Sequence, residues 1–181
     1  MVMEYQQVVN FWFHEIDSKL WFEKNEEFDQ LMTKKYSTTF NEALAGKFSS
    51  WRQTPEGRLA EVLVLDQFSR NIFRGSAKAF SGDALALQLA QEAVALGEDK
   101  KLNLQQRAFL YMPYMHSEDR QVHEEAVKLF SEKGLENNLH FEILHKNIID
   151  RFGRYPHRNE ILGRPSTVEE IEFLKQPNSS F

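Results

Sequence analysis

The sequence has no cysteine among its 181 residues. That absence excludes disulfides, thiolate nucleophiles, iron–sulfur clusters and cysteine-ligated zinc. Glycine and proline are scarce, with 8 and 5 residues, which excludes a collagen-like or low-complexity chain. No apolar run is long enough to cross a bilayer, and the first residues show no basic stretch leading into an apolar one. We therefore expect a cytoplasmic protein without a membrane partner.

Positively charged residues are fewer than negatively charged ones, with 22 Lys and Arg and 27 Asp and Glu, which gives a net charge of −5. A general nucleic-acid binder carries a basic surface, so this balance argues against a nucleic-acid partner. Aromatic rings are plentiful at 13% of the residues, and 15 residues are phenylalanine. A chain of this length buries about 70% of the surface of its unfolded form. We expect the large rings to dominate that core.

Helical patterns run through the whole chain, and no alternation of apolar and polar residues lasts long enough to nominate a strand. Thr54 before Pro55 is a typical helix start, and Gly97 after an alanine-rich stretch is a typical stop. Pro113 is expected to stop or kink a helix. The predicted fold class is all-α, with helices at 6–13, 25–45, 55–73, 82–96, 103–112, 117–133 and 137–152, and a short one after a capping box at 166–169.

The turns between these helices are short, which favours antiparallel helix pairs. Ala126 and Phe130, with the alanine-rich stretch 82–96, resemble parts of tetratricopeptide repeats, although the full consensus of about 34 residues is absent. We expect one all-helical, tetratricopeptide-like domain over residues 1–181. An irregular helical bundle satisfies the periodicity equally well.

The helix expected at 55–73 carries charges on an apolar face. Asp66 and Arg70 lie one turn apart among leucine and phenylalanine residues. The opposite face is apolar too, so the helix is expected to be central and buried. Two interpretations of the buried charges stay open. They form an ion pair that only fixes the register of the helix, or they line a cavity in which Asp66 orients Arg70 towards a ligand, with Gln67 and Asn71 beside them.

Two histidines are candidate catalytic residues. His145 lies at the edge of the apolar stripe of helix 137–152, and His116 follows Pro113 at a helix break. A histidine close to acids at such a break suits general acid–base chemistry. The plainer interpretations are a hydrogen-bonded core histidine for His145, and turn or capping chemistry around His116.

The segment 153–167 is rich in turn formers and in hydrogen-bond donors that suit oxyanions. Arginine binds carboxylate and phosphate groups through two parallel hydrogen bonds. Arg154, His157, Arg158 and Asn159 are therefore candidate ligand-binding residues. The alternative is a connector whose arginines cap the carboxyl end of helix 137–152.

Several specific chemistries find no support in the spacing of residues. The eight glycines form neither a dinucleotide-binding pattern nor a P-loop, and neither GxSxG nor HExxH occurs. His140 and His145 are five residues apart, so their side chains point in different directions on a helix and do not ligate one metal ion. We expect no metal site and no cofactor.

Five sets of residues stand out as longer motifs: FWF at 11–13, WF at 21–22, TPEGRLAEVLVLDQFSRNIFRG at 54–75, FLYMPYMHSED at 109–119, and IIDRFGRYPHRNEILGR followed by ST at 148–167. Together they resemble the uncharacterised bacterial family known as domain of unknown function 924, over nearly the whole chain. The sequence reads NSSF at 178–181 where that family leads us to expect GSSF. The resemblance implies an all-α fold similar to tetratricopeptide repeats, and it implies no activity and no catalytic residues.

The hypothesis from the sequence is a polar pocket for a small anionic or carboxylate-bearing molecule. Arg70 and Arg158 would bind the anion, Asp66 would hold Arg70, and His116 or His145 would carry a proton in cofactor-free hydrolytic or acid–base chemistry. One alternative is a tetratricopeptide-like module that binds a peptide or its carboxylate on a concave face. Another is a structural helical protein whose ion pairs only set register. No oligomeric state is predicted.

Overall fold

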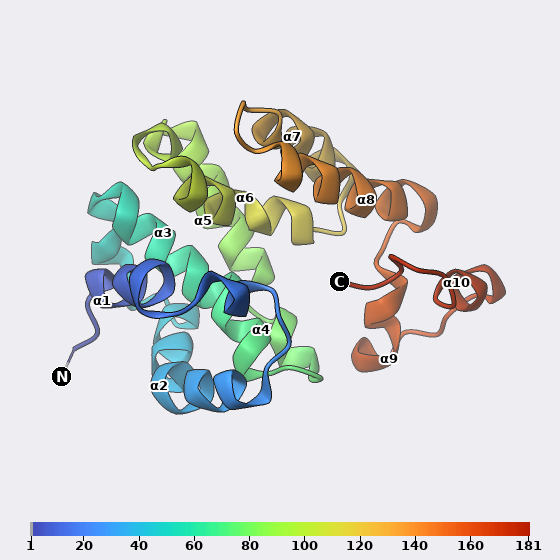
Figure 1. The fold of residues 1–181 in the computed structure, drawn as a ribbon, viewed down its shortest axis with the longest axis horizontal. Coiled ribbons are helices and arrows are strands. Elements are labelled where there is room, and N and C mark those ends of the chain that lie inside the picture. Colours follow the sequence, from blue (N-terminus) through green and yellow to red (C-terminus); the bar gives the residue numbers. More distant parts are fainter. Residues whose placement is uncertain (1) are drawn as a thin grey trace. The chain divides into compact units, whose positions relative to one another are not determined.

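The regular elements of the protein are all helical. The computed structural model describes residues 2–181, and no strand occurs in that range. The all-α prediction is therefore confirmed. None of the helices within 2–181 combines the length and the apolar character needed to cross a membrane. The chain divides into two compact units, Met1–Pro113 and Tyr114–Phe181 (Figure 1).

The first unit holds the elements coloured blue to green in Figure 1. In chain order they are α1 (Tyr5–Asn10), η1 (Phe11–Glu15), η2 (Ser18–Trp21), α2 (Glu26–Leu44), η3 (Ser49–Gln53), α3 (Pro55–Leu63), η4 (Val64–Phe68), α4 (Ser69–Ile72), η5 (Ala77–Phe80), α5 (Asp83–Ala95), η6 (Glu98–Lys101) and most of α6 (Leu104–His116).

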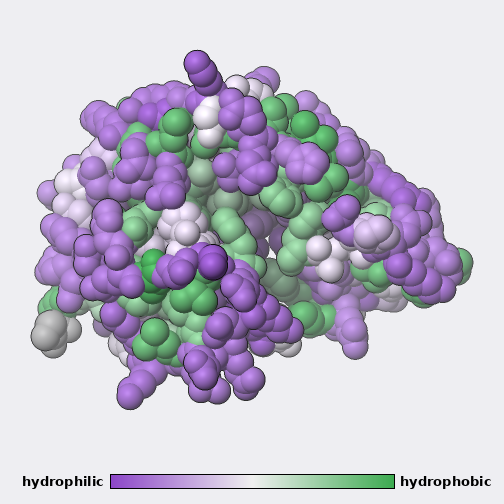
Figure 2. Space-filling view, viewed as in Figure 1, coloured by the Kyte–Doolittle hydropathy of each residue, from purple (hydrophilic) through white to green (hydrophobic). Residues whose placement is uncertain are grey.

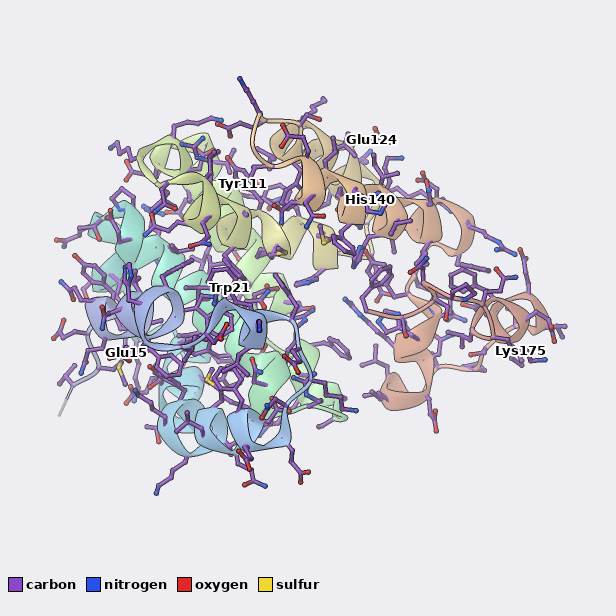
Figure 3. All side chains as sticks on the ribbon, viewed as in Figure 1. Glu15, Trp21, Tyr111, Glu124, His140 and Lys175 are labelled. Atoms are coloured by element: carbon purple, nitrogen blue, oxygen red, sulfur yellow. The ribbon has the colours of Figure 1, made fainter. Side chains whose placement is uncertain are left out.

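Aromatic rings fill the core of this unit, as expected from the composition. Trp12, Tyr36 and Phe68 are fully buried. The ring centroid of Phe68 lies 5.3 Å from that of Trp12 and 4.7 Å from that of Tyr36. Trp21, labelled in Figure 3, donates its indole N–H to the carbonyl of Trp12 at 2.9 Å. Ring pairs of this kind contribute about 0.5–1.5 kcal/mol each beyond the area that they bury.

The segment formed by α3, η4 and α4 crosses this core. Thr54 caps it by accepting a hydrogen bond from the Gly57 N–H at 3.0 Å. Every residue from Leu59 to Ser69 is buried, so the prediction of a central, buried helix is confirmed. Gly57 is required because a Cβ there would lie 1.9 Å from the Trp51 carbonyl oxygen.

The middle of that segment, η4, is wound as a π-helix, which alters the usual pattern of backbone hydrogen bonds. The side chains that follow it bind the carbonyls of this turn. The Ser69 hydroxyl donates to the carbonyls of Leu65 and Asp66 at 2.7 and 3.0 Å, and Arg70 donates to the Asp66 carbonyl at 2.8 Å. The residue before α5 packs against the same turn, because a Cβ on Gly82 would lie 2.5 Å from the Leu65 carbonyl oxygen.

The second unit contains a pair of helices, α7 (Arg120–Phe130) and α8 (Glu136–Phe152). The pair is antiparallel, because Arg120 at the start of α7 donates to the Ile149 carbonyl near the end of α8, whereas His123 meets Glu142 earlier in α8. Figure 3 labels a residue on each helix, Glu124 and His140. The chain continues through η7 (Pro156–Arg158), α9 (Asn159–Leu162) and α10 (Val168–Phe173). Ile148, Ile149 and Tyr155 form an apolar core with Phe152 and Phe173 against it.

Several helix ends differ from the sequence prediction. α6 continues through Pro113 to His116, so Pro113 does not stop it. Asp119, and not Ser117, caps α7 by accepting from the N–H groups of residues 121 and 122, because an aspartate caps a helix as well as a serine. The capping box before α10 uses Thr167 and Glu170, one residue later than expected.

Hydrophilic residues cover most of the face shown in Figure 2, with apolar residues visible in patches between them. Large apolar residues that stay exposed include Phe22 in the first unit, and Phe141, Ile171 and Phe181 in the second. The tetratricopeptide-like arrangement and the single domain over 1–181 remain predictions.

Candidate functional site

The four predicted site residues of the first unit do not share one partner. Asp66 is fully buried, and its carboxylate accepts a hydrogen bond from Gln67 at 2.9 Å. Arg70 lies 3.5 Å from Asp66 Oδ1 but forms two shorter bonds, of 2.8 and 3.0 Å, with the carboxylate oxygens of Asp83. Asp83 is the first residue of α5 and was not among the predicted site residues. The strongest ion pair of Arg70 therefore joins α4 to α5.

Asn71 lies on another side of the same segment. Its amide donates to Asp29 at 3.0 Å, and Arg74 binds the same carboxylate through two hydrogen bonds of 2.6 and 3.1 Å. These three residues lie in an open cleft of about 790 Å³. The residues that line it belong to the loop before α2, to α2, to the end of α4 and to the turn after it: Lys24, Glu26, Asp29, Gln30, Thr33, Lys34, Asn71, Ile72, Arg74 and Gly75.

In the second unit, predicted residues gather around one ring, that of Tyr155. α8 ends at Phe152, Gly153 caps it in the left-handed conformation (φ 71°), and Pro156 opens the turn η7. Tyr155 is buried between these two turns. The rings of His145 and His157 each lie 5.7 Å from the Tyr155 ring, and the Arg158 guanidinium lies 4.6 Å from it. Arg158 also donates to the carbonyl of His116 at 3.0 Å. We call His116, His145, Tyr155, His157 and Arg158 the Tyr155 cluster.

His145 is held as a neutral imidazole. Its Nδ1 contacts the Phe141 carbonyl at 2.7 Å, which requires a proton on Nδ1 and leaves the lone pair on Nε2. Burial, with some help from the charges of neighbouring histidines, lowers the pKa of His145 to about 3. The Nδ1 contact agrees with the interpretation of His145 as a hydrogen-bonded core histidine. Its Nε2 is a hydrogen-bond acceptor near neutral pH.

A buried His–Glu pair beside the cluster was not predicted. His123 Nδ1 lies 2.5 Å from Glu142 Oε1, and both side chains are fully buried. Burial raises the pKa of Glu142, and the hydrogen bond with His123 opposes this rise. The other ring nitrogen lies 2.7 Å from the Ser117 carbonyl and 3.2 Å from the Tyr155 hydroxyl. The signal in the sequence was the placement of His123 on the buried stripe of α7, with Ala126 and Phe130.

The remaining arginine and asparagine candidates hold the segment 153–170 together. Arg154 binds Glu170 through bonds of 2.9 and 2.7 Å, and the Asn159 amide reaches the same carboxylate at 3.3 Å. The hydrogen bond from Arg154 lowers the pKa of Glu170 to about 2. Both predicted residues therefore make contacts that stabilise this segment, and their part in ligand binding stays a prediction.

Glu118 plays the same holding role at the start of the segment. It accepts two bonds from Arg164, at 2.9 and 3.1 Å, and one from the Tyr155 N–H at 2.7 Å. Burial alone would raise the pKa of Glu118, but these hydrogen bonds and the charges of Arg158 and Arg164 hold it below its ordinary value. Residues 2–181 contain no group of three His, Asp or Glu placed to hold a metal ion.

An all-helical fold with such a cluster defines no known activity by itself, because fold does not fix function. The comparison with known proteins gives the family. The model of a family described as bacterial protein of unknown function (DUF924) matches residues 8–178, and the chain belongs to this family. A solved structure of a protein of unknown function, ATU0120 from Agrobacterium tumefaciens, is 36% identical, with a TM-score of 0.89 over 94% of this chain and 96% of that chain. No curated protein matches the chain.

Proposed function

We propose that the protein binds a small anionic molecule, a carboxylate or a phosphate, at the Tyr155 cluster. The observation that carries the proposal is the position of Arg158. It is only 7% exposed, lies over the ring of Tyr155, and is next in sequence to His157 of the same cluster. A buried guanidinium with histidines around the same ring supplies the donors that an oxyanion requires.

The carboxylates around the cluster support this proposal because each is engaged by another side chain. Glu118 is bound by Arg164, and Glu170 is bound by Arg154. Glu142 is bound by His123. The arginines paired with Glu118 and Glu170 offset the negative charge of these two carboxylates, which reduces the repulsion that an entering anion meets.

The two catalytic candidates take different roles in this proposal. An imidazole with a pKa of about 3 is a weak base near neutral pH, so His145 does not carry the proton in this proposal. Its Nε2 accepts a hydrogen bond instead. Proton transfer in any cofactor-free hydrolytic or acid–base reaction then falls to His116, which is only partly buried at the end of α6. Asp66, Gln67, Arg70 and Asn71 lie in the first unit and take no part in this proposal; their ligand-binding role stays a prediction.

The test is calorimetric titration of the purified protein with propanoate and with inorganic phosphate, alongside thermal unfolding. An anion present at 100 times its Kd adds about 2.7 kcal/mol to the free energy of unfolding, so Tm rises by several degrees. We expect Arg158→Met to weaken binding by at least about tenfold, as loss of a charged hydrogen bond does.

A matched control is Arg151→Met, which removes an exposed arginine of the same unit that pairs with Glu169. This variant is expected to bind the anion as the wild type does. Because Arg158→Met removes a buried side chain, His157→Gln serves as a second, milder variant, and it too is expected to weaken binding. Equal affinities in all four proteins, or no binding of either anion to the wild type, would contradict the proposal.

A further inference from the structure

The ring of Phe181 lies on the Tyr155 cluster. Its centroid is 3.7 Å from that of His145, and the two planes differ by 24°, which is a stacked arrangement. The His157 and Phe181 ring centroids lie 6.3 Å apart, and the ring planes differ by 74°, an edge-to-face arrangement. His145 is buried, whereas Phe181 is 50% exposed. One face of the Phe181 ring therefore covers the imidazole, and much of the rest of the residue stays in water.

The segment that carries this ring, 174–181, follows α10 and turns back towards α8. The Ser179 hydroxyl donates to the Leu174 carbonyl at 3.2 Å, a bond inside the segment itself, and Asn178 adopts a positive φ of 61°. Ordering such a segment costs conformational entropy at every residue, and a half-exposed stacked ring returns only part of it. Opening the contact between Phe181 and His145 therefore gives up one half-exposed ring contact and returns conformational entropy to the segment.

The surface beneath the ring is an imidazole face that suits a flat aromatic group. His145 is neutral, and its face stacks with another aromatic ring, as the contact with Phe181 shows. The Tyr155 ring lies edge-to-face with His145 at 84°, and the His157 ring lies edge-to-face with Phe181 at 74°. The Arg158 guanidinium lies 4.6 Å from the Tyr155 ring, within the same cluster. A ring-binding face thus adjoins the donors that the proposed function assigns to an anion.

We propose that the Phe181 ring occupies the place of a ligand's aromatic ring, and that the Tyr155 cluster binds a small aromatic carboxylate once the segment 174–181 turns aside. This inference rests on the proposed function and adds the substrate class to it. The carboxylate meets Arg158 and His157, and the ligand's ring stacks on His145. Phe181 then competes with the ligand for the same face of the imidazole.

The experiment compares three probes of equal charge, 3-phenylpropanoate, 3-cyclohexylpropanoate and propanoate, by calorimetric titration. The proteins are the wild type, Phe181→Ala and the control Phe141→Ala, which removes another exposed phenylalanine of the same unit. We expect Phe181→Ala to bind 3-phenylpropanoate about threefold to tenfold more tightly, because the competing ring is gone. Propanoate is expected to bind equally to all three proteins, and the saturated ring to gain less than the aromatic one.

Two results separate this inference from the proposed function. If propanoate and phosphate bind but the aromatic ring adds no affinity, or if Phe181→Ala binds 3-phenylpropanoate more weakly, the inference is wrong and anion binding stands. If no anion binds to any of the proteins, the proposed function is wrong as well.

A second measurement needs no variant: in the wild type, NMR signals of the Phe181 ring should move towards solvent-exposed values as 3-phenylpropanoate is added. Unchanged Phe181 signals at saturation would overturn the inference.

Discussion

The carboxylate of Asp83 holds the guanidinium of Arg70 with two hydrogen bonds of 2.8 and 3.0 Å, and thereby ties the end of the central segment to the start of α5. Both side chains are about four-fifths buried, at 20% and 19% exposure. Arg70 also donates to the Asp66 carbonyl of the π-helical turn. Arg70, a charged residue on a helix face that is otherwise apolar, thus joins α4 to α5.

The variant Asp83→Asn tests this link. It keeps the size of the side chain but removes the charge and one acceptor from the bidentate pair, so we expect the free energy of unfolding to fall by about 1.5–3 kcal/mol. Urea denaturation followed by circular dichroism measures this change. The control Glu172→Gln breaks an exposed pair with Lys175 and is expected to cost less than about 1 kcal/mol. Equal costs in the two variants would contradict the role given to Asp83.

Glycine at position 57 is a second stability test. A Cβ there would lie 1.9 Å from the Trp51 carbonyl oxygen, which belongs to the backbone and has little room to move. We expect Gly57→Ala to destabilise the protein by more than about 3 kcal/mol. Gly46→Ala is the matched control, because Gly46 has a positive φ of 75° but open space around it, and its cost should be about 1 kcal/mol. A Gly57→Ala protein as stable as the control would show that the close approach is absent.

The lowered pKa of His145 predicts a pH dependence of stability. Between the ordinary pKa of 6.5 and the folded pKa of about 3, the unfolded chain binds a proton on this residue and the folded chain does not. The free energy of unfolding therefore falls as the pH drops through this window, by about 2 kcal/mol between pH 7 and pH 5. In His145→Gln this part of the slope should disappear, as denaturation at several pH values can measure.

Comparing the wild type with His145→Gln isolates the contribution of His145, because the other titrating groups are the same in both proteins. The lowered pKa of Glu170 also makes the free energy of unfolding fall as the pH drops, but only below its ordinary pKa of 4.5. The raised pKa of Glu142 has the opposite effect, because it makes the free energy of unfolding fall as the pH rises. The control His140→Gln removes an exposed histidine of the same helix and should keep the wild-type slope. A His145→Gln protein with that slope would mean that His145 titrates in the folded state as it does in the unfolded chain.

Much of the fold followed from the sequence because its signals are local. Thr54, Pro55 and the apolar residues after them specify a buried helix within a few residues of chain, and the structure has it. The π-helical winding of η4 was not predictable, because the angles of a regular helix assume that the hydrogen-bond pattern never changes. The start of α7 was misplaced because Ser117 and Asp119 are both good caps, and only the structure selects one.

The candidate site was harder to predict because its contacts join residues far apart in the chain. Arg154 and Arg158 look alike in the sequence, yet Arg154 binds Glu170 while Arg158 lies over Tyr155. No spacing rule links His123 to Glu142, since the contact depends on how α7 and α8 pack. Tyr155, on which the cluster centres, was visible only as one more residue of a turn-rich segment.

The most direct test of the central claim is a histidine NMR titration of the wild-type protein with propanoate, following the ring signals of His116, His145 and His157. Binding at the Tyr155 cluster predicts that the His157 signal moves with the others, and that all of them yield one Kd. Signals that stay in place while calorimetry still detects propanoate, with shifts instead at Asn71 and Arg74 of the first unit, would contradict the account and transfer anion binding to the cleft beside α2.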